Sequence, residues 1–568
     1  MPVIDVKFSR VRGLLSRDIS ISELEEVLFR FGMELDGVKE TENGDYMLKI
    51  EVTPDRPDML STWGLARALR KYLGISMGLD EYIIKDSTFE IHVDESVTPI
   101  RPFIAAVVAK NVNLRIEDLE DLIYAQEKLH ETFCRGRKKA SIGFYPFNIL
   151  RWPLVYRAED PEKIRFKPLG FSELMNGREI LQKHPTGQKY AHLLEGFDKY
   201  PIFTDSAGHV LSMPPIINSE DYGKITETDR DILLEVTGTH KPTVKLVVNI
   251  MASILKDLSA DLYYVTIRYP KGAEKSPYLS PRKWKLSVKY VERILGIKIS
   301  KSEIISLLNR MGLDGNFTNE EEIEVLVPGY RADIWHPIDI VDDIARAYGF
   351  DNFEPELTPV FTTGGVLRRT EIVDYIRELM LGLGYTEVFT FALTSTEDQF
   401  TKMLLPIDNE IVTIMGAKEA KINMMRKWLI PEILKTLAYN KDKKYPIRLF
   451  EVSDIVLLSE TADTHAINET RLAAVSAHKE ADFTEIRRVT EYVLRALGFE
   501  KFLIKRIDHP SFIRGRVAGI YIDNELVCIL GEMHPQVITN WGLTVPIAAM
   551  ELSIDKLMKW SYKPVEIE

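Results

Sequence analysis

One segment of this chain occurs twice, and the repetition limits the folds available to it. Residues 19–37 read ISISELEEVLFRFGMELDG, and residues 299–315 read ISKSEIISLLNRMGLDG. In both copies a strand-like run follows, and then an Arg-x-Asp motif, RPDM at 56–59 and RADI at 331–334. A chance resemblance between two helices would not keep this order of elements. The sequence therefore predicts two copies of one small α/β module.

We place the two copies at residues 1–80 and 278–355, and each is predicted to contain a capped amphipathic helix. In the first copy Ser20 and Glu23 have the spacing of a capping box, and the second copy repeats it. Gly32 suits the left-handed residue that ends a helix. These local signals agree with the repeat.

Composition narrows the class of protein. The chain has 568 residues and a formal net charge of −12, which predicts several domains and disfavours indiscriminate nucleic-acid binding. A local basic patch for one RNA is still compatible with this charge. Its two cysteines, Cys134 and Cys528, have no metal-ligand spacing and fit a reducing cytoplasm. No apolar run approaches the ~20 residues of a membrane helix. We expect a soluble cytoplasmic protein that does not associate with membranes.

The rest of the chain is predicted to form two further domains. Residues 81–270 mix strand and helix patterns, which is typical of an α+β domain. Strand-like runs lie at 103–109, 232–237, 244–250 and 262–269, and helix-like runs at 116–133 and 187–194. Residues 356–568 form the last predicted domain, in which an Asp-Asn pair between two apolar runs predicts an antiparallel hairpin at 517–530.

Four aspartates distinguish the second copy from the first. When the copies are aligned on Arg-x-Asp, the second has acidic residues where the first has glycine, arginine and alanine. The four are Asp333, Asp339, Asp342 and Asp343. Three are spaced i, i+3, i+4 and share a helix face, and a hard cation with oxygen ligands such as Mg²⁺ would relieve their repulsion. The simpler alternative is that they favour a helix N-terminus or are solvated.

These motifs also carry a family resemblance. The stretch RADIWHPIDIVDDIARAYGF at 331–350 resembles the signature of the beta subunit of phenylalanine–tRNA ligase (phenylalanyl-tRNA synthetase) of the archaeal/eukaryotic type. VTPDRPDMLSTWGLARALRKYLG at 52–74 and RGRKKASIGF at 135–144 also match, as do PPIINSE from Pro214 and DILLEVTGTH from Asp231. The resemblance covers essentially the whole chain.

The resemblance implies a function and a fold. It implies that the four aspartates bind Mg²⁺, and that the chain is the non-catalytic beta subunit of an α2β2 heterotetramer that uses ATP to attach phenylalanine to tRNA(Phe). The fold class it implies is α+β and multidomain: the duplicated module with its metal-binding copy, a central α+β editing-type domain, and a C-terminal class II synthetase-like antiparallel-sheet domain that lacks a catalytic site.

Few residues of the last domain match the ATP-binding motifs of class II ligases. RLFE at 448–451 is similar to the first motif, but GEMHPQV from Gly531 lacks the second glycine and the arginine of the other. We expect Arg426 and Arg448 to have structural roles. The alpha subunit then carries the active site for aminoacylation, and this chain acts as scaffold and RNA platform.

The resemblance further implies that the middle domain hydrolyses tRNA(Phe) mischarged with tyrosine. A pocket for phenylalanine discriminates imperfectly against tyrosine, which differs by one hydroxyl, so a second, hydrolytic site adds selectivity. Polar candidates for that hydrolytic site are Ser212, Asn218, Glu235 and Thr237. Glu235 and Thr237 alternate on a predicted strand and share a face. No nucleophilic triad spacing is present, which favours water-mediated hydrolysis.

A basic run is the candidate contact for tRNA or for the partner subunit: Arg135, Arg137, Lys138 and Lys139. A solvated helix end is the alternative. Two other classes of function are possible from the residues alone. One is a non-enzymatic nucleic-acid-binding protein, which leaves the acidic cluster unexplained. The other is a free-standing ester hydrolase, which leaves the large C-terminal domain without a role.

Overall fold

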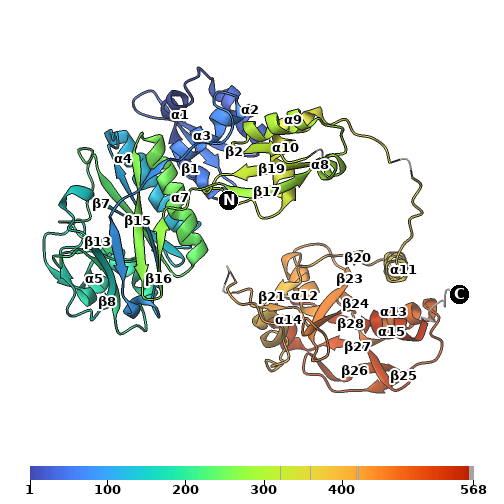
Figure 1. Cartoon of the computed structure of the whole chain (residues 1–568). Coiled ribbons are helices and arrows are strands. Elements are labelled where there is room, and N and C mark those ends of the chain that lie inside the picture. The colour runs from blue at the N-terminus through green and yellow to red at the C-terminus, as the bar shows by residue number, and fades with distance from the viewer. Residues whose placement is uncertain (320, 359, 418, 420, 562–568) are drawn as a thin grey trace. The chain divides into compact units, whose positions relative to one another are not determined.

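The chain forms two compact units, Met1–Leu357 and Thr358–Glu568 (Figure 1). The computed structural model describes residues 1–319, 321–358, 360–417, 419 and 421–561. The expected mixed α/β, multidomain character is confirmed. The four-part division is finer than the two units and stays a prediction.

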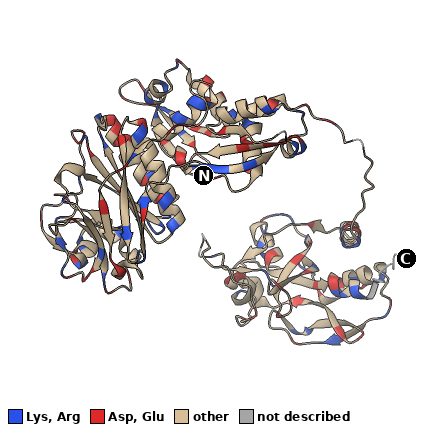
Figure 2. Cartoon of the chain, viewed as in Figure 1, with Lys and Arg blue, Asp and Glu red and all other residues tan. Residues whose placement is uncertain are grey.

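In the part of the chain that is described, no helix is long and apolar enough to cross a membrane. Basic and acidic residues are interspersed along the chain in both units (Figure 2).

The two copies of the repeat have the same order of elements and the same sheet topology. The first contains β1 (Val3–Lys7), α1 (Phe8–Leu15), α2 (Ile21–Phe31), β2 (Glu34–Glu40), β3 (Tyr46–Glu51) and α3 (Thr62–Tyr72). The second contains β17 (Arg282–Ser287), α8 (Val288–Leu295), α9 (Lys301–Arg310), β18 (Asp314–Phe317), β19 (Glu322–Val327) and α10 (Pro337–Tyr348). Each sheet is antiparallel, with orders β1-β3-β2 and β17-β19-β18.

The copies pack against each other reciprocally. Helix α3 packs on α9, and α10 packs on α2. Each copy places a long basic side chain over the glycine that ends the other copy's helix. A Cβ on Gly32 would lie 2.5 Å from Arg346 Nη1, and one on Gly312 would lie 2.7 Å from Lys71 Cδ. Both glycines have positive φ, which favours glycine at the helix end, and a Cβ at either position would displace the basic side chain that lies over it.

The middle of the first unit is an 11-stranded sheet. Its main path is β13-β12-β11-β8-β5-β15-β6-β14-β7, and β4 and β16 also pair with β15. The central strands are β4 (Ile84–Lys85), β5 (Glu90–Val93), β6 (Phe103–Lys110), β7 (Ala140–Pro146), β14 (Ile232–Gly238), β15 (Asp261–Tyr269) and β16 (Gly272–Ser276). The remainder are β8 (Leu154–Glu159), β11 (Tyr200–Thr204), β12 (Val210–Met213) and β13 (Ile217–Asn218), with β9 (Arg165–Phe166) and β10 (Met175–Asn176) forming a separate pair.

Helices cover one face of the β6–β14–β7 region of this sheet. They are α4 (Ile116–Glu131) and α7 (Lys241–Asp257), while α5 (Gly177–Lys183) and α6 (Pro185–Tyr190) belong to a smaller core. The prediction of a strand at 244–250 is wrong, because this run lies inside α7. A helix buried on most sides gives a continuous apolar run, which periodicity does not distinguish from a buried strand. Pro242 in the first turn was the available signal.

The second unit is a seven-stranded sheet with helices on both faces. Its order is β20-β23-β24-β28-β27-β26-β25, and all neighbours are antiparallel except β20 and β23. The strands are β20 (Thr386–Glu387), β23 (Ile447–Leu458), β24 (Ala466–Ala477), β25 (Leu503–Arg506), β26 (Phe512–Ile522), β27 (Glu525–Met533) and β28 (Ile547–Ser553), with β21 (Leu393–Thr394) and β22 (Met424–Met425) paired separately. The predicted hairpin is confirmed as β26–β27, with positive φ at Asp523 and Asn524.

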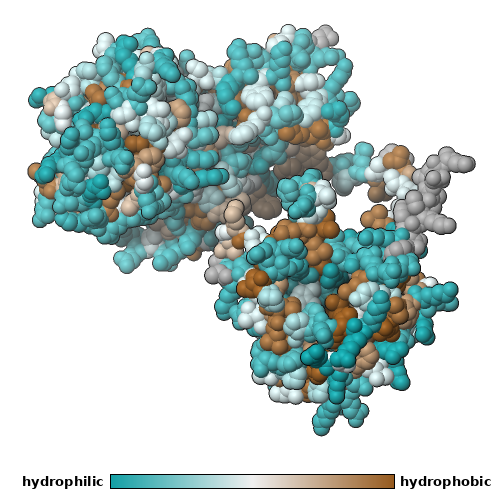
Figure 3. Space-filling model, turned by 90° about the horizontal axis from the view of Figure 1, so that it is seen from below, coloured by the Kyte–Doolittle hydropathy of each residue, from teal (hydrophilic) through white to brown (hydrophobic). Residues whose placement is uncertain are grey.

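Two groups of helices enclose this sheet. One face is covered by α11 (Arg368–Gly382), α13 (Phe483–Ala496) and α15 (Ile554–Ser561), and the other by α12 (Ile430–Tyr439) and α14 (Pro535–Asn540). The space-filling representation shows apolar residues on the viewed face of this unit (Figure 3).

Candidate functional sites

The four aspartates of the second copy do not gather in one place. Asp333 and Asp343 meet at Arg331, whose Nε lies 2.7 Å from Asp333 Oδ1 and whose Nη2 lies 2.7 Å from Asp343 Oδ2. Asp339 caps α10, where its Oδ2 accepts from the backbone nitrogens of Trp335 and His336. The fourth is separate again.

That fourth aspartate, Asp342, is half-exposed and pairs with Arg346 one helical turn further on. The spacing of the motif did not predict that Arg331, its first residue, is itself buried among the carboxylates. Burial alone would raise the pKa of Asp333, but the guanidinium of Arg331 overrides it and lowers the pKa to about 2. Asp333 is therefore held ionised by a protein cation.

This arrangement does not fit a Mg²⁺ site as it stands. A cation would have to displace a guanidinium from two carboxylates, and the other two point to partners of their own. Among the described residues, no group of three or more His, Cys, Asp or Glu is placed to hold a metal ion. The prediction of a Mg²⁺ site stays a prediction, and the geometry supports an arginine-centred ion cluster.

The first copy contains a simpler version of this cluster. Arg56 binds Asp58 through both Nε and Nη2, at 2.9 and 2.8 Å, and both side chains are buried. Where the second copy has Asp339, the first has Gly64, and a Cβ there would lie 1.9 Å from the backbone oxygen of Asp58. The glycine that replaces the acidic residue is therefore required by the packing of this turn.

Three of the four predicted editing residues line one cavity in the middle of the first unit. The cavity has a volume of about 220 Å³ and is bounded by β7, β12, β13, β14 and α4. Ser212, Asn218 and Glu235 contribute to its wall. Ser212 and Asn218 are directly paired between β12 and β13, which explains why residues separated in sequence share one wall.

Thr237 lies behind this wall. Its hydroxyl accepts from Arg101 Nε at 3.0 Å and contacts the hydroxyl of Ser141, a cavity residue, at 3.1 Å. Arg101 is buried and also donates to the backbone oxygens of Thr237 and Arg137. Thr237 therefore belongs to the support of the cavity.

Glu235 is the chemically unusual residue of the cavity. It is 2 % exposed, and its Oε2 accepts from the hydroxyl of Tyr145 at 3.0 Å. Its Oε1 has no hydrogen-bond partner among the described residues. Burial raises the pKa of Glu235 to about 7, against the smaller opposing effects of Tyr145, Arg101 and Thr237. An acid that titrates near neutral pH, with a free oxygen beside a cavity, is a functional-site feature.

Three residues of β7 at this site were missed: Ser141, Gly143 and Tyr145. Gly143 lies opposite Glu235 in the β7–β14 ladder, and a Cβ there would lie 2.5 Å from Tyr145 Oη and 2.7 Å from Glu235 Oε2. Ser141, Gly143 and Tyr145 alternate on β7, so one face of that strand carries only small or polar groups. The alternation in KKASIGFYP was the signal that could have found them.

One residue of the basic run 135–139 lines the Glu235 cavity, and the other basic residues lie nearer the protein surface. Arg137 lines the cavity, where Nη1 donates to the backbone oxygen of Ile216 at 2.8 Å and Nη2 pairs with Glu127 at 3.0 Å. Its guanidinium also lies over the ring of Tyr190. Arg135 and Lys138 are exposed and Lys139 is half-buried. Arg137 thus has a structural role, and its neighbours remain candidate RNA or subunit contacts.

The arginines of the second unit are engaged by carboxylates. Arg426 is buried and pairs with Glu451 at 2.8 Å, and Arg448 donates to Glu485 at 3.0 Å. On β28, Glu551 accepts from the backbone nitrogens of Leu429 and Ile430. These contacts agree with structural roles for both arginines.

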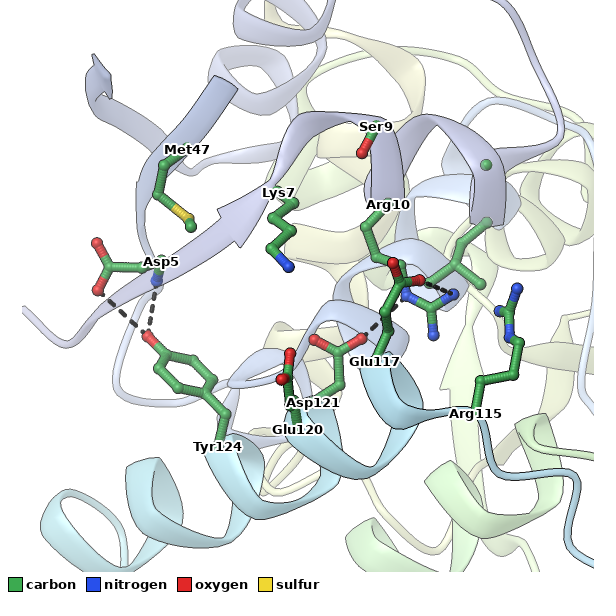
Figure 4. Close-up of a pocket in the computed structure, with 12 residues that line it drawn as sticks. Asp5, Lys7, Ser9, Arg10, Met47, Arg115, Glu117, Glu120, Asp121 and Tyr124 are labelled. Carbon is green, nitrogen blue, oxygen red and sulfur yellow. Dashed lines mark hydrogen bonds and ion pairs between the residues drawn. The ribbon is translucent and has the colours of Figure 1, made fainter. Parts of the chain in front are cut away.

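A second cavity, of about 450 Å³, lies between the first module and α4 (Figure 4). Arg10 pairs with Asp121 and Glu117 of its lining, and the Tyr124 hydroxyl accepts from the backbone nitrogen of Asp5. Lys7 points into it from β1 (Figure 4). We regard it as the polar junction between these two parts.

Models of known protein families match both copies of the repeated module and the second unit. Three family models match: the B1 domain of the Phe-tRNA synthetase beta subunit at 1–75, the tRNA synthetase B5 domain at 284–350, and the CLM domain of the phenylalanyl-tRNA synthetase beta chain at 355–554. Fold and models together define the chain as a subunit of an aminoacyl-tRNA synthetase.

Full-length relatives identify which synthetase. The chain is 36% identical to the phenylalanine–tRNA ligase beta subunits of Thermococcus sibiricus, over 99% of this chain and 100% of the relative, and of Pyrococcus furiosus, over 98% and 100%. A crystal structure of an N-terminal fragment of the Pyrococcus horikoshii beta subunit is 34% identical, with a TM-score of 0.59, and covers 61% of this chain and 99% of the fragment. The chain belongs to the phenylalanine–tRNA ligase beta-subunit family, and it acts in the aminoacylation of tRNA(Phe).

Proposed function

We propose that, beyond supporting aminoacylation, this chain hydrolyses Tyr-tRNA(Phe) in the cavity of Glu235. The observation that carries the proposal is the unpartnered Oε1 of a buried carboxyl group at the wall of that cavity. A tyrosyl group brings a phenol that satisfies such an oxygen, whereas a phenylalanyl group leaves it unpaired. Leaving a buried polar group unpaired costs about 1–3 kcal/mol, which corresponds to roughly ten- to hundredfold selectivity.

The residues around the cavity favour attack by water. The described residues that line it include neither histidine nor cysteine, so no base stands beside Ser212 to make it a nucleophile. His130, a buried imidazole on α4, accepts from the backbone nitrogen of Ile142. In our proposal Glu235 and Ser212 bind the phenol, and the substrate's own groups orient the water that attacks the ester.

The test uses the beta chain co-purified with its alpha partner and Tyr-tRNA(Phe) as substrate. Glu235→Gln keeps the volume and removes the acid, and Glu235→Ala removes both. We expect each to slow hydrolysis by about tenfold or more while aminoacylation with phenylalanine is unchanged. Unchanged hydrolysis in both Glu235 variants would remove this residue from the site.

The matched control is Glu227→Gln, which makes the same chemical change at a glutamate outside the cavity. Glu227 is exposed in the segment before β14 and does not line the cavity. The substitution removes one carboxylate without touching the proposed site. We therefore expect wild-type hydrolysis and wild-type aminoacylation from it.

We also propose that the second unit is an inactive copy of a class II catalytic core. Support comes from Arg426 and Arg448, whose guanidinium groups are bound by Glu451 and Glu485 and so are not free for a triphosphate. The chain alone should then fail to exchange pyrophosphate with ATP and phenylalanine, and should support the reaction once the alpha partner is added. Exchange by the chain alone would contradict this.

An exposed apolar strip supports docking of the alpha partner on the same unit. Phe389, Phe391 and Leu393 alternate along the segment after β20 and are 86, 87 and 48% exposed. Exposed aromatic side chains beside a sheet edge are typical of a protein interface. We expect Phe389→Glu with Phe391→Glu to abolish co-purification of the alpha subunit, while Phe29→Glu, at an exposed phenylalanine of α2, leaves it intact.

The remaining assignments follow from the family. We propose an α2β2 assembly in the cytoplasm that uses ATP and Mg²⁺ for aminoacylation, with Arg135, Lys138 and Lys139 as contacts to tRNA(Phe) or to the alpha subunit. Replacing all three by glutamine should weaken tRNA binding in a salt-dependent way.

A further inference from the structure

The buried hydroxyl of Tyr145 connects the two polar side chains of the Glu235 cavity. Tyr145 lies on β7, is fully buried, and packs its ring edge-on against Phe203 at 5.6 Å between centroids. Its Oη lies 2.7 Å from Ser212 Oγ and 3.0 Å from Glu235 Oε2. Ser212 and Glu235 line the cavity, whereas Tyr145 stands behind them.

A phenol has one hydrogen, so Tyr145 donates only one of these two bonds. When Glu235 is ionised, its carboxylate accepts from Tyr145, and Tyr145 accepts from Ser212. The hydroxyl hydrogen of Ser212 is then directed inward, and Ser212 offers only lone pairs to the cavity. When Glu235 carries a proton on Oε2, the direction of both hydrogen bonds reverses: Glu235 donates to Tyr145, and Tyr145 donates to Ser212. The hydroxyl hydrogen of Ser212 is then free to face the cavity.

We propose that Tyr145 is a positioning residue that couples the proton on Glu235 to the hydrogen-bonding polarity of Ser212 in the cavity. The inference rests on the proposed editing function and goes further than it. With Glu235 ionised, both cavity residues accept hydrogen bonds, which suits the phenol O–H of a tyrosyl ester. With Glu235 protonated on Oε2, Ser212 offers a donor in place of an acceptor, and Oε1 still accepts but has lost its negative charge, so the phenol O–H is bound less well.

The surroundings of Glu235 place this change near neutral pH. Burial raises its pKa to about 7, and the groups that act on it are Tyr145 from β7, Thr237 from β14, Tyr156 from β8 and Arg101 from the segment before β6. The other charged residues of the cavity lining, which are farther along its wall, are Glu127, Arg137 and Lys224. Both states of the hydroxyl chain are therefore populated in the physiological range.

The experiment measures hydrolysis of Tyr-tRNA(Phe) by the complex of this chain with its alpha partner, from about pH 6 to 8.5, with spontaneous hydrolysis subtracted. For the wild type we expect KM to fall by about tenfold as Glu235 ionises, with a smaller change in kcat. Tyr145→Phe breaks the series of hydroxyl hydrogen bonds and should reduce this fall in KM to the part that the charge of Glu235 causes by itself. Ser212→Ala removes the cavity end of the series and should give the same reduced pH dependence, and the double variant should add nothing further.

Tyr269→Phe is the matched control. Tyr269 lies on β15, and its hydroxyl bonds to the backbone of Ile104, outside the chain of hydroxyl groups. It should keep the wild-type pH profile, which separates loss of a buried tyrosine hydroxyl from loss of the coupling. Ser212→Ala carries the test if Tyr145→Phe lowers the melting temperature too far to be assayed.

The outcomes separate the two claims. A wild-type complex that does not hydrolyse Tyr-tRNA(Phe) contradicts the proposed editing function, and the inference falls with it. A wild-type complex that hydrolyses it, while Ser212→Ala or a folded Tyr145→Phe keeps the wild-type pH profile, overturns the coupling and leaves editing intact.

Discussion

Two sites in the first unit bury carboxyl groups, and burying a negative charge is unfavourable at both. One site offsets this cost with a protein cation and the other with a bound proton. At the junction of the two modules, Asp333 and Asp343 share the single cation of Arg331. In the cavity, Glu235 has no ion-pair partner among the described residues and is neutral when it binds a proton near pH 7. A carboxylate satisfied by a protein cation supports the fold, whereas one left with a free oxygen and a pKa near neutrality is available for chemistry.

The largest effect should come from removing the cation at the junction. Arg331→Met leaves two buried carboxylates without a partner, and we expect it to lower the free energy of unfolding by about 3–5 kcal/mol. Arg56→Met, at the equivalent position of the first copy, breaks hydrogen bonds to Asp58 alone and removes only a longer-range attraction to Asp333 and Asp343, so it should cost less. Urea titration of the wild type and the two variants measures both values.

That comparison contains its own control. The substitution is the same at both positions, and the two sites have the same local fold, so the difference between the variants reports the number of carboxylates left unpaired. An equal or larger cost at Arg56 would show that the second copy gains nothing from its extra aspartates.

The next effect concerns the pH dependence of stability, which has the opposite sign at Glu235 and at Asp333. Glu235 has a raised pKa, so between about pH 4.5 and 7 the folded state holds a proton that the unfolded state has lost. Stability should therefore fall as the pH rises through this window, by up to about 3 kcal/mol. Glu235→Gln removes this dependence. Thermal unfolding of both proteins at intervals from about pH 5 to 8 measures it.

Asp333→Asn is the counterpart. The pKa of Asp333 is lowered to about 2, so its stabilising effect is complete above the unfolded value of 3.8 and is lost as the pH falls through about 2. The cost of Asp333→Asn should thus be constant from about pH 5 to 8. Parallel stability curves for wild type and Glu235→Gln over that range would remove the distinction between the two sites.

How far the sequence predicted these sites depends on the kind of signal each one gives. The duplicated module was predictable, because capping residues, Gly32 and the Arg-x-Asp motif are local and occur twice. Glu235 and Thr237 were candidates because the family resemblance implies an editing pocket, and strand alternation placed them on one face. The role of Arg331 was not predicted, because residue spacing places the carboxylates on a helix but does not show which cation lies beside them.

Tertiary contacts account for the other differences. Tyr145 and Gly143 lie beside Glu235 because β7 pairs with β14 in one particular register. The alternation on β7 places both on one face of that strand but does not specify the register. The error at 244–250 has the same origin, since burial of α7 on most sides removes the periodicity that marks a helix. In each case the missing information was the identity of the neighbour.

The smallest expected effect concerns metal removal at the module junction. Arg331 already binds both Asp333 and Asp343, so a divalent cation would have to displace its guanidinium to reach them. Treatment of the chain with EDTA, followed by titration with Mg²⁺, should change its free energy of unfolding by less than about 0.5 kcal/mol, whereas a resident ion at about a hundred times its Kd would add about 2.7 kcal/mol. A Mg²⁺-dependent rise in melting temperature that Asp339→Asn abolishes would instead establish the cation site that the four aspartates suggest, and would require Arg331 to move when the ion binds.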